Sequence, residues 1–247
     1  MCNFQSKADS PRKSRIALLG DSMTWIGGDS CEKATGWTHT LKESGLYDNI
    51  DMLARSGATW TNTTATSPDL EFYCEVLHDN NVIYNQSLRL IEKYDQQKLA
   101  DPDRIIIFAG ANDAWFSDKR PGIYNSVDSL QSIAIRENNP SNVTSLYGSV
   151  SLACGILQER FPTAKLILVT PLQMSKVSEE IILKVSDIIE KAGLSKGCTV
   201  LRGDKEIAIR HSDEVNKHIY TYDGVHTNPQ GAALVGNYIV DHLKTEK

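Results

Sequence analysis

The chain has 247 residues, of which 40% are hydrophobic and 23% are charged, and its formal net charge is −5. These proportions are those of a globular protein that is long enough to bury a sizeable core. The acidic balance argues against nucleic-acid binding, which normally needs a basic surface. No stretch approaches the roughly 18 apolar residues of a membrane-spanning helix. We therefore expect no nucleic-acid partner and no transmembrane segment.

The chain begins with a polar stretch, residues 1–14, that has no apolar h-region. We expect this stretch to be a flexible tail and not a signal peptide. Cys2 followed by such a tail resembles a bacterial lipoprotein whose signal has been removed and replaced by Met1, which would place the protein in the periplasm or at the cell surface. An ordinary cytoplasmic start is the alternative, and the sequence leaves both open.

Five short apolar runs predict buried strands, and stretches of helical periodicity separate them. In chain order, the predicted strands are 16–19, 49–54, 104–109, 165–170 and 198–201. The predicted helices are 36–44, 82–99, 142–160, 178–191 and 230–243, with one short helix expected in 60–80 and one in 117–142. This alternation implies a mostly parallel sheet that is covered on both faces. Because no linker or repeat interrupts it, we predict a single domain over residues 15–247.

The five cysteines show no C-x-x-C pair and no metal-ligand spacing. They are Cys2, Cys31, Cys74, Cys154 and Cys198. Such a scattered set favours buried thiols over a disulfide framework, although one disulfide is left open.

The first predicted strand ends at Gly20, and Asp21 and Ser22 follow directly. In open α/β sheets, ligands bind beyond the carboxyl ends of the strands, where helix N-termini present free N–H groups. Ser22 is therefore well placed to be a nucleophile. The alternative is that Ser22 only caps the next helix.

Three more polar stretches follow later in the chain. Gly57 comes after the second predicted strand, and Asn112 and Asp113 come after the most apolar one. Asp223 and His226 lie three residues apart, just before the last predicted helix. Taken singly, these residues have structural explanations as turn, helix-cap or surface residues.

Taken together with Ser22, these residues have the chemistry of nucleophilic catalysis. A serine hydroxyl needs a base to remove its proton during attack, and the imidazole of His226 suits that task. Asp223 is close enough in sequence to fix the tautomer of His226 and to stabilise the imidazolium. Attack on an ester also creates an oxyanion, which needs preorganised donors. This chemistry requires no metal and no organic cofactor, so we expect none.

Four blocks in this order resemble those of the SGNH hydrolases, also called the GDSL esterase/lipase family. The blocks are Gly20-Asp21-Ser22, Gly57, Gly110-x-Asn112-Asp113 and Asp223-x-x-His226. The resemblance extends from about residue 15 to 243. Met23 and Ala111 depart from the common leucine and threonine, at positions that carry no chemistry. The resemblance implies a three-layer α/β/α sandwich, flavodoxin-like, with a mostly parallel five-stranded sheet.

The resemblance also implies roles for individual residues. The oxyanion donors would be the backbone N–H groups of Ser22 and Gly57 and the side-chain amide of Asn112. From the residue types themselves, we also expect Asp21 and Asp113 to support the turns around the site through hydrogen bonds to the backbone. Two aromatic residues, Trp25 and Trp115, could line the pocket, but we favour core packing for both.

We predict a serine esterase that releases short acyl groups through an acyl-enzyme intermediate. The loops expected to rim the site, 61–64 and 117–120, are polar, which favours short acyl groups over long ones. The favoured substrate is an O-acetyl ester on a carbohydrate. One alternative is a lipid hydrolase resembling lysophospholipases or thioesterases. Another is a catalytically silent binding module, against which the presence of all four reactive residue types argues. The sequence leaves the oligomeric state open.

Overall fold

The computed structural model describes residues 14–71 and 73–245. Cys2 and nearly all of the expected tail lie outside these residues. Five parallel strands form one sheet in the order β2-β1-β3-β4-β5. The strands are β1 (Arg15–Gly20), β2 (Asn49–Met52), β3 (Arg104–Phe108), β4 (Lys165–Val169) and β5 (Thr199–Leu201).

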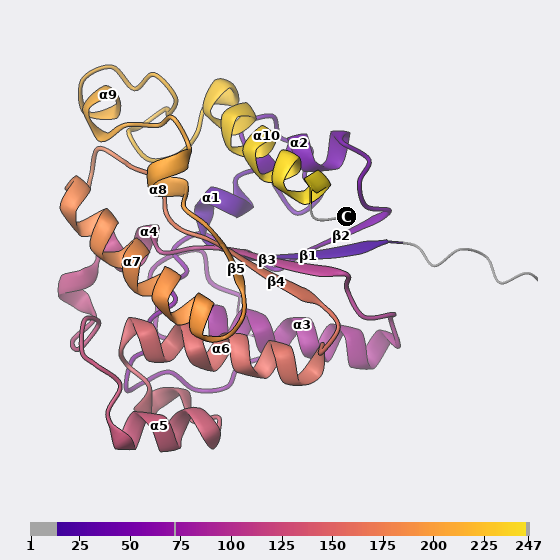
Figure 1. The fold of residues 1–247 in the computed structure, drawn as a ribbon, viewed down its shortest axis with the longest axis vertical. Helices are drawn as coiled ribbons and strands as arrows, with labels where there is room; N and C mark the ends of the chain where they lie inside the picture. The colour runs from indigo at the N-terminus through magenta and orange to yellow at the C-terminus, as the bar shows by residue number, and fades with distance from the viewer. Residues whose placement is uncertain (1–13, 72, 246–247) are drawn as a thin grey trace, which may run out of the picture.

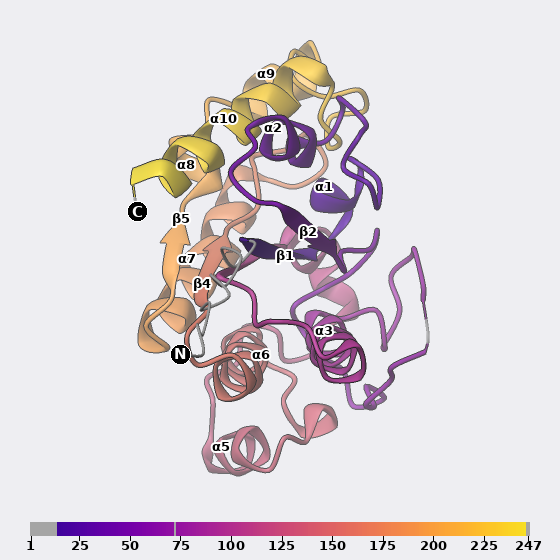
Figure 2. The same cartoon turned by 90° about the vertical axis from the view of Figure 1, so that its right-hand side faces the viewer.

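Helices cover both faces of this sheet, as Figures 1 and 2 show from two sides. On one face, α2 (Trp37–Glu43) packs against α10 (Pro229–Thr245). On the other face lie α3 (Ile83–Gln97), α6 (Leu146–Arg160) and α7 (Glu179–Ser195). The predicted three-layer α/β/α fold with a five-stranded parallel sheet is therefore confirmed.

The central strands are apolar along their whole length because helices cover both faces. Residues 16–19 of β1 and 105–107 of β3 are completely buried. Parallel sheets of this kind show continuous apolar runs rather than alternation. In the register of the sheet, Gly20 at the end of β1 pairs with Phe108 at the end of β3. The segments that follow these two strands therefore start side by side.

Several short helices at the ends of the strands have no periodicity that the sequence could reveal. They are α1 (Ser22–Trp25), α4 (Ala111–Trp115), α8 (Gly203–Glu206) and α9 (His211–Asn216). In Figure 1, α1 and α4 lie beyond the carboxyl ends of the strands. The helix expected within 117–142 is α5 (Ser129–Arg136), which is flanked by the 3₁₀ turns η1 (Ser117–Lys119) and η2 (Pro140–Asn142).

The expectation of a short helix within 60–80 was wrong, because the described residues of this segment form no helix. Side chains bind the segment instead: Thr63 Oγ1 donates to Asp79 Oδ1 at 2.6 Å and Thr66 Oγ1 donates to Asp79 O at 2.7 Å. Short polar side chains that bond nearby backbone and carboxylate groups compete with helix formation. Across residues 14–71 and 73–245, no helix has the length and apolar character to cross a membrane.

Candidate active site

Ser22, His226 and Asp223 form a continuous chain of hydrogen bonds. His226 Nε2 lies 3.0 Å from Ser22 Oγ, and His226 Nδ1 lies 2.8 Å from Asp223 Oδ2. Ser22 is the first residue of α1, whereas the other two lie in the loop before α10. The fold thus joins residues 204 positions apart into the arrangement by which a serine hydroxyl is activated.

Asp21 caps α1, so the interpretation of Ser22 as a helix cap is wrong. The Asp21 Oδ1 atom accepts a hydrogen bond of 2.9 Å from the backbone N–H of Met23. The Ser22 hydroxyl is left to interact with His226. Burial raises the pKa of Asp21 to about 7, and the nearby Asp113 carboxylate adds to the rise, while the backbone N–H of Met23 offsets part of it.

Gly20, directly before this cap, sits in a backbone conformation that only glycine adopts readily. Its φ is +149°, and a Cβ atom there would lie 2.2 Å from Phe108 O. The buried side chain of Gln86, in α3, holds both backbone groups of Gly20. Gln86 Oε1 accepts from Gly20 N at 2.8 Å, and Gln86 Nε2 donates to Gly20 O at 2.9 Å. In the sequence, the only signal of Gln86 is an amide on the buried face of an amphipathic helix.

Asn112 is bound to the loop that follows β2, at the residue next to Gly57. Asn112 lies in α4 and its Nδ2 donates to Ala58 O at 3.0 Å. An amide nitrogen carries two hydrogens, so this bond fixes the Asn112 side chain and leaves one hydrogen for a ligand. Among the described residues, no acceptor pairs with the backbone N–H of Ser22 or of Gly57. These three groups are thus able to donate to an oxyanion.

Asp113 links α4 to the loop after Gly57. Its carboxylate accepts from Trp60 N at 2.9 Å, from Thr61 N at 2.8 Å and from Thr61 Oγ1 at 2.6 Å. Burial raises the pKa of Asp113, while the bonds from Thr61 and Trp60 lower it in part. These bonds hold Thr61 in the interior, and Asn62 is buried as well. The expectation that these two residues form part of a polar rim was therefore wrong.

A different segment, residues 73–77, lies against Gly57. Gly57 has a φ of +74°, and a Cβ atom there would lie 2.3 Å from the carbonyl carbon of Val76. Asn81 Nδ2 anchors the segment by donating to Ser56 O at 2.7 Å and to Val76 O at 2.9 Å. The side chains of Val76 and Tyr73 are 64% and 49% exposed. Val76, with its exposed side chain, therefore lies beside Gly57, whereas the Tyr73 ring faces the guanidinium groups of Arg55 and Arg89, which lie 4.3 and 5.0 Å from its centroid.

Backbone N–H groups hold the Asp223 carboxylate in place, in addition to the imidazole of His226. Its Oδ1 atom accepts from His226 N at 2.8 Å and from Val225 N at 3.0 Å. Partial burial raises the pKa of Asp223, but the hydrogen bonds from the side chain and N–H of His226 and from Val225 outweigh it and hold the pKa below its usual value. The carboxylate is therefore charged at neutral pH, as an orienting partner for an imidazole must be.

The two tryptophans differ in their surroundings. Trp115 is 38% exposed and stacks on Phe116 with ring centroids 5.3 Å apart, so the expectation of core packing was wrong for it. Trp25 is half-buried, and the Lys33 ammonium lies 5.8 Å from its ring centroid. The four cysteines within the described residues are free thiols, and Cys31, Cys154 and Cys198 are buried.

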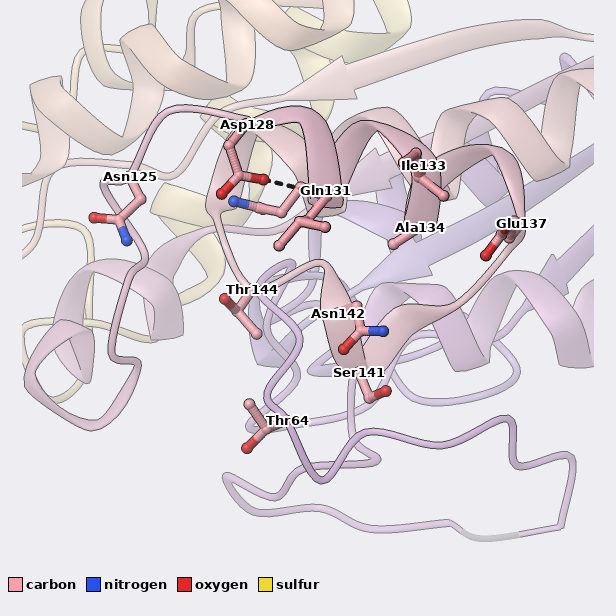
Figure 3. Close-up of a pocket in the computed structure, with 11 residues that line it drawn as sticks. Thr64, Asn125, Asp128, Gln131, Ile133, Ala134, Glu137, Ser141, Asn142 and Thr144 are labelled. Atoms are coloured by element: carbon pink, nitrogen blue, oxygen red, sulfur yellow. Dashed lines mark hydrogen bonds between the residues drawn. The ribbon is translucent and has the colours of Figure 1, made fainter.

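A cavity of about 460 Å³ lies apart from the four blocks, between α5 and nearby loops (Figure 3). Its eleven lining residues include Thr64, Asp128 and Gln131 but no histidine or cysteine. It therefore lacks the usual nucleophile–base pair, and the chain of contacts around Ser22 is the better candidate for catalysis.

A sequence profile described as the GDSL-like lipase/acylhydrolase family matches residues 18–234. No curated protein matches the chain.

Solved structures share the fold at low sequence identity. A Lactobacillus plantarum protein is 18% identical with a TM-score of 0.64, over 95% of this chain and 98% of that one. A lipase/acylhydrolase from Enterococcus faecalis is 18% identical with a TM-score of 0.52, over 94% and 96%. A lipolytic protein of the G-D-S-L family from Veillonella parvula is 14% identical with a TM-score of 0.54, over 92% and 97%. These likenesses concern the fold alone.

Proposed function

Because the chain belongs to the GDSL-like lipase/acylhydrolase family, we propose that it is a serine esterase with Ser22 as its nucleophile. His226 is the general base and Asp223 orients it. The observation that carries this assignment is the unbroken hydrogen-bond chain, with 3.0 Å from Ser22 Oγ to His226 Nε2 and 2.8 Å from His226 Nδ1 to Asp223 Oδ2. Both contacts are within the range for proton transfer and for holding a tautomer.

The reaction then proceeds in two halves. Ser22 Oγ attacks the ester carbonyl while its proton moves to His226 Nε2. The N–H groups of Ser22 and Gly57 and the Asn112 amide stabilise the oxyanion of the tetrahedral intermediate. As the alcohol leaves, it takes the proton from His226, and the acyl group stays on Ser22. Water then attacks this acyl-enzyme while one of its protons moves to His226. The carboxylic acid leaves as His226 returns that proton to Ser22 Oγ, which restores the enzyme.

We propose short acyl groups, with O-acetyl esters of a carbohydrate as the favoured substrate. The side chains of Asp223 and His226 are 53% and 33% exposed, so the alcohol side of the ester would meet an open and polar surface. A hydrated sugar suits such a surface better than a lipid does, because it loses less solvation there.

The exposed side chains of Val76 and Tyr73 favour a second candidate, a hydrolase for longer acyl chains. Each CH₂ group that these residues shield from water would contribute roughly 0.8 kcal/mol to binding. A panel of nitrophenyl esters separates the two candidates. Specificity constants that peak between acetyl and butyryl support the short-acyl proposal, and constants that rise steadily to octanoate support the lipid hydrolase.

The nucleophile is tested with Ser22→Ala. We expect a folded protein that a fluorophosphonate probe no longer labels, with activity reduced to the residual catalysis of the oxyanion site, about 10³–10⁴-fold over water. Ser67→Ala, a substitution in the loop far along the chain from α1, is the matched control and should keep both labelling and activity. Full activity in Ser22→Ala would end the serine-hydrolase assignment.

A further inference from the structure

Glu214 is a buried carboxyl group that takes no part in the proposed chemistry. It lies in α9 and is completely buried. Its Oε1 atom accepts a hydrogen bond of 2.9 Å from the backbone N–H of Tyr220, and its Oε2 atom accepts from the hydroxyl of Thr221. Burial of a carboxyl group is costly unless its oxygens are hydrogen-bonded. Both donors come from one short segment, so Glu214 ties this segment to α9.

The hydroxyl of Thr221 carries this connection into the turn that contains Asp223. A hydroxyl group has one hydrogen and two acceptor lone pairs. Thr221 Oγ1 donates its hydrogen to Glu214 and accepts from the backbone N–H of Gly224 at 2.9 Å. The carbonyl of Gly224 accepts in turn from Ser175 N at 2.7 Å. Gly224, the residue directly after Asp223, is therefore fixed through both of its backbone groups.

The same segment forms one side of the turn that carries His226. Thr221 and Thr227 form an antiparallel bridge, which is the base of this turn. A backbone hydrogen bond of 2.9 Å from Tyr222 N to His226 O joins the two sides next to the bridge. Glu214 therefore anchors the base of the turn from which both of its catalytic side chains project.

The catalytic side chains of this turn are more exposed than its base. Those of Asp223 and His226 are 53% and 33% exposed, whereas Thr221 and Thr227 are 3% and 2% exposed. The position of the imidazole therefore depends on the buried base more than on packing around the ring. Because Ser22 belongs to a separate element, α1, a shift of the base changes the 3.0 Å distance from His226 Nε2 to Ser22 Oγ. A displacement of about 1 Å at an active site costs about 10²-fold in rate.

We propose that Glu214 is a positioning residue for catalysis. Through its two hydrogen bonds it fixes the base of the turn, and with it the position of His226 relative to Ser22. This inference rests on the proposed esterase function. Because Glu214 is buried away from the substrate and the reacting atoms, its loss should slow the proton transfers and leave substrate binding unchanged. A group that only stabilised the fold would lower the melting temperature without slowing the reaction.

Two substitutions of similar size test this role, with 4-nitrophenyl acetate as the substrate at a temperature well below every melting transition. Glu214→Gln keeps an acceptor for Tyr220 N, but its NH₂ group is unable to accept from the Thr221 hydroxyl. Thr221→Val keeps the shape of the side chain and removes the hydroxyl. We expect kcat to fall tenfold or more in each variant, with KM within twofold of the parent.

Two more variants show whether the hydrogen-bonded connection itself is responsible. The double variant of Glu214→Gln and Thr221→Val should have the kcat of the slower single variant, because both substitutions break the same connection. Thr221→Ser keeps the hydroxyl, so its kcat should stay within threefold of the parent.

Asp51→Asn is the matched control. Asp51 lies in the edge strand β2 and is 6% exposed, and its carboxylate accepts from Arg15 Nη1 at 2.9 Å and from Tyr94 Oη at 2.6 Å. Its substitution should lower the melting temperature and leave kcat within twofold of the parent. Parental kcat in Glu214→Gln and Thr221→Val would overturn the proposal. So would a rise in KM in place of the fall in kcat, or an equal fall of kcat in Asp51→Asn.

The failure of this inference is distinguishable from the failure of the proposed function. A parent that hydrolyses 4-nitrophenyl acetate, together with variants that keep its kcat, refutes the role of Glu214 and leaves the esterase intact. A parent that neither hydrolyses this ester nor reacts with a fluorophosphonate probe refutes the esterase and the inference together.

Discussion

Replacing Asn112 by alanine separates transition-state binding from substrate binding. The side chain is 7% exposed, and its single described contact, Nδ2 to Ala58 O at 3.0 Å, fixes the amide without using its second hydrogen. A donor that is preorganised in a poorly hydrated site stabilises the developing oxyanion more than the ground-state carbonyl. Removing one such donor costs about 2.7–4 kcal/mol in the transition state, or about 10²–10³-fold in kcat. We therefore expect kcat to fall by this factor in Asn112→Ala, with little change in KM.

The same substitution also breaks the bond to Ala58 O. A lost hydrogen bond of this kind costs about 0.5–1.5 kcal/mol of folding free energy, so the melting temperature should fall modestly. Asn62→Ala is the matched control, because Asn62 is equally buried and its Nδ2 donates to Val143 O at 3.2 Å, outside the proposed site. It should lose similar stability and keep its kcat.

Steady-state hydrolysis of 4-nitrophenyl acetate, measured beside thermal unfolding, resolves these effects. The oxyanion assignment is wrong if KM rises tenfold while kcat is unchanged, because Asn112 would then bind the ground state. It is also wrong if Asn62→Ala loses as much kcat as Asn112→Ala, since the loss would then follow stability.

Two further substitutions test the backbone around the nucleophile. Asp21→Asn keeps an N-cap and removes a carboxyl whose pKa is raised by burial to about 7, so the folded parent holds this proton more tightly than the unfolded chain does. The parent should therefore lose stability as pH rises from about 4 to 7, and the variant should lose less. Identical curves of melting temperature against pH for the two proteins would contradict the raised pKa of Asp21. Gly57→Ala places a Cβ atom 2.3 Å from the carbonyl carbon of Val76 at a φ of +74°, so it should lower both the melting temperature and kcat. An alanine variant with parental melting temperature and kcat would contradict the expected clash between this Cβ atom and Val76.

The sequence by itself determined the strands and the order of the four blocks. Residues 16–19 and 105–107 are apolar without interruption because both faces of a parallel sheet are covered. Such a continuous apolar run can be recognised from the sequence alone. Glycine before Asp21 and the spacing of Asp223 and His226 are local features too. Bonds such as those from Asp223 Oδ1 to the N–H groups of Val225 and His226 span only two or three residues, so a short stretch of sequence contains all of their atoms.

Only the tertiary structure decided which polar residues work together. The hydrogen bonds between Gln86 and Gly20 join residues 66 positions apart, and the contact of His226 with Ser22 joins residues 204 positions apart. The side chains that close such long loops carry no periodicity, so Gln86 looks like an ordinary polar residue in the sequence. The error over Thr61 has the same reason, because the Asp113 carboxylate that draws Thr61 into the interior lies 52 positions away. Elements that bury one or both faces show periodic or continuous apolar residues in the sequence. Hydrogen bonds between distant segments show no such pattern, because they depend on geometry that exists only after folding.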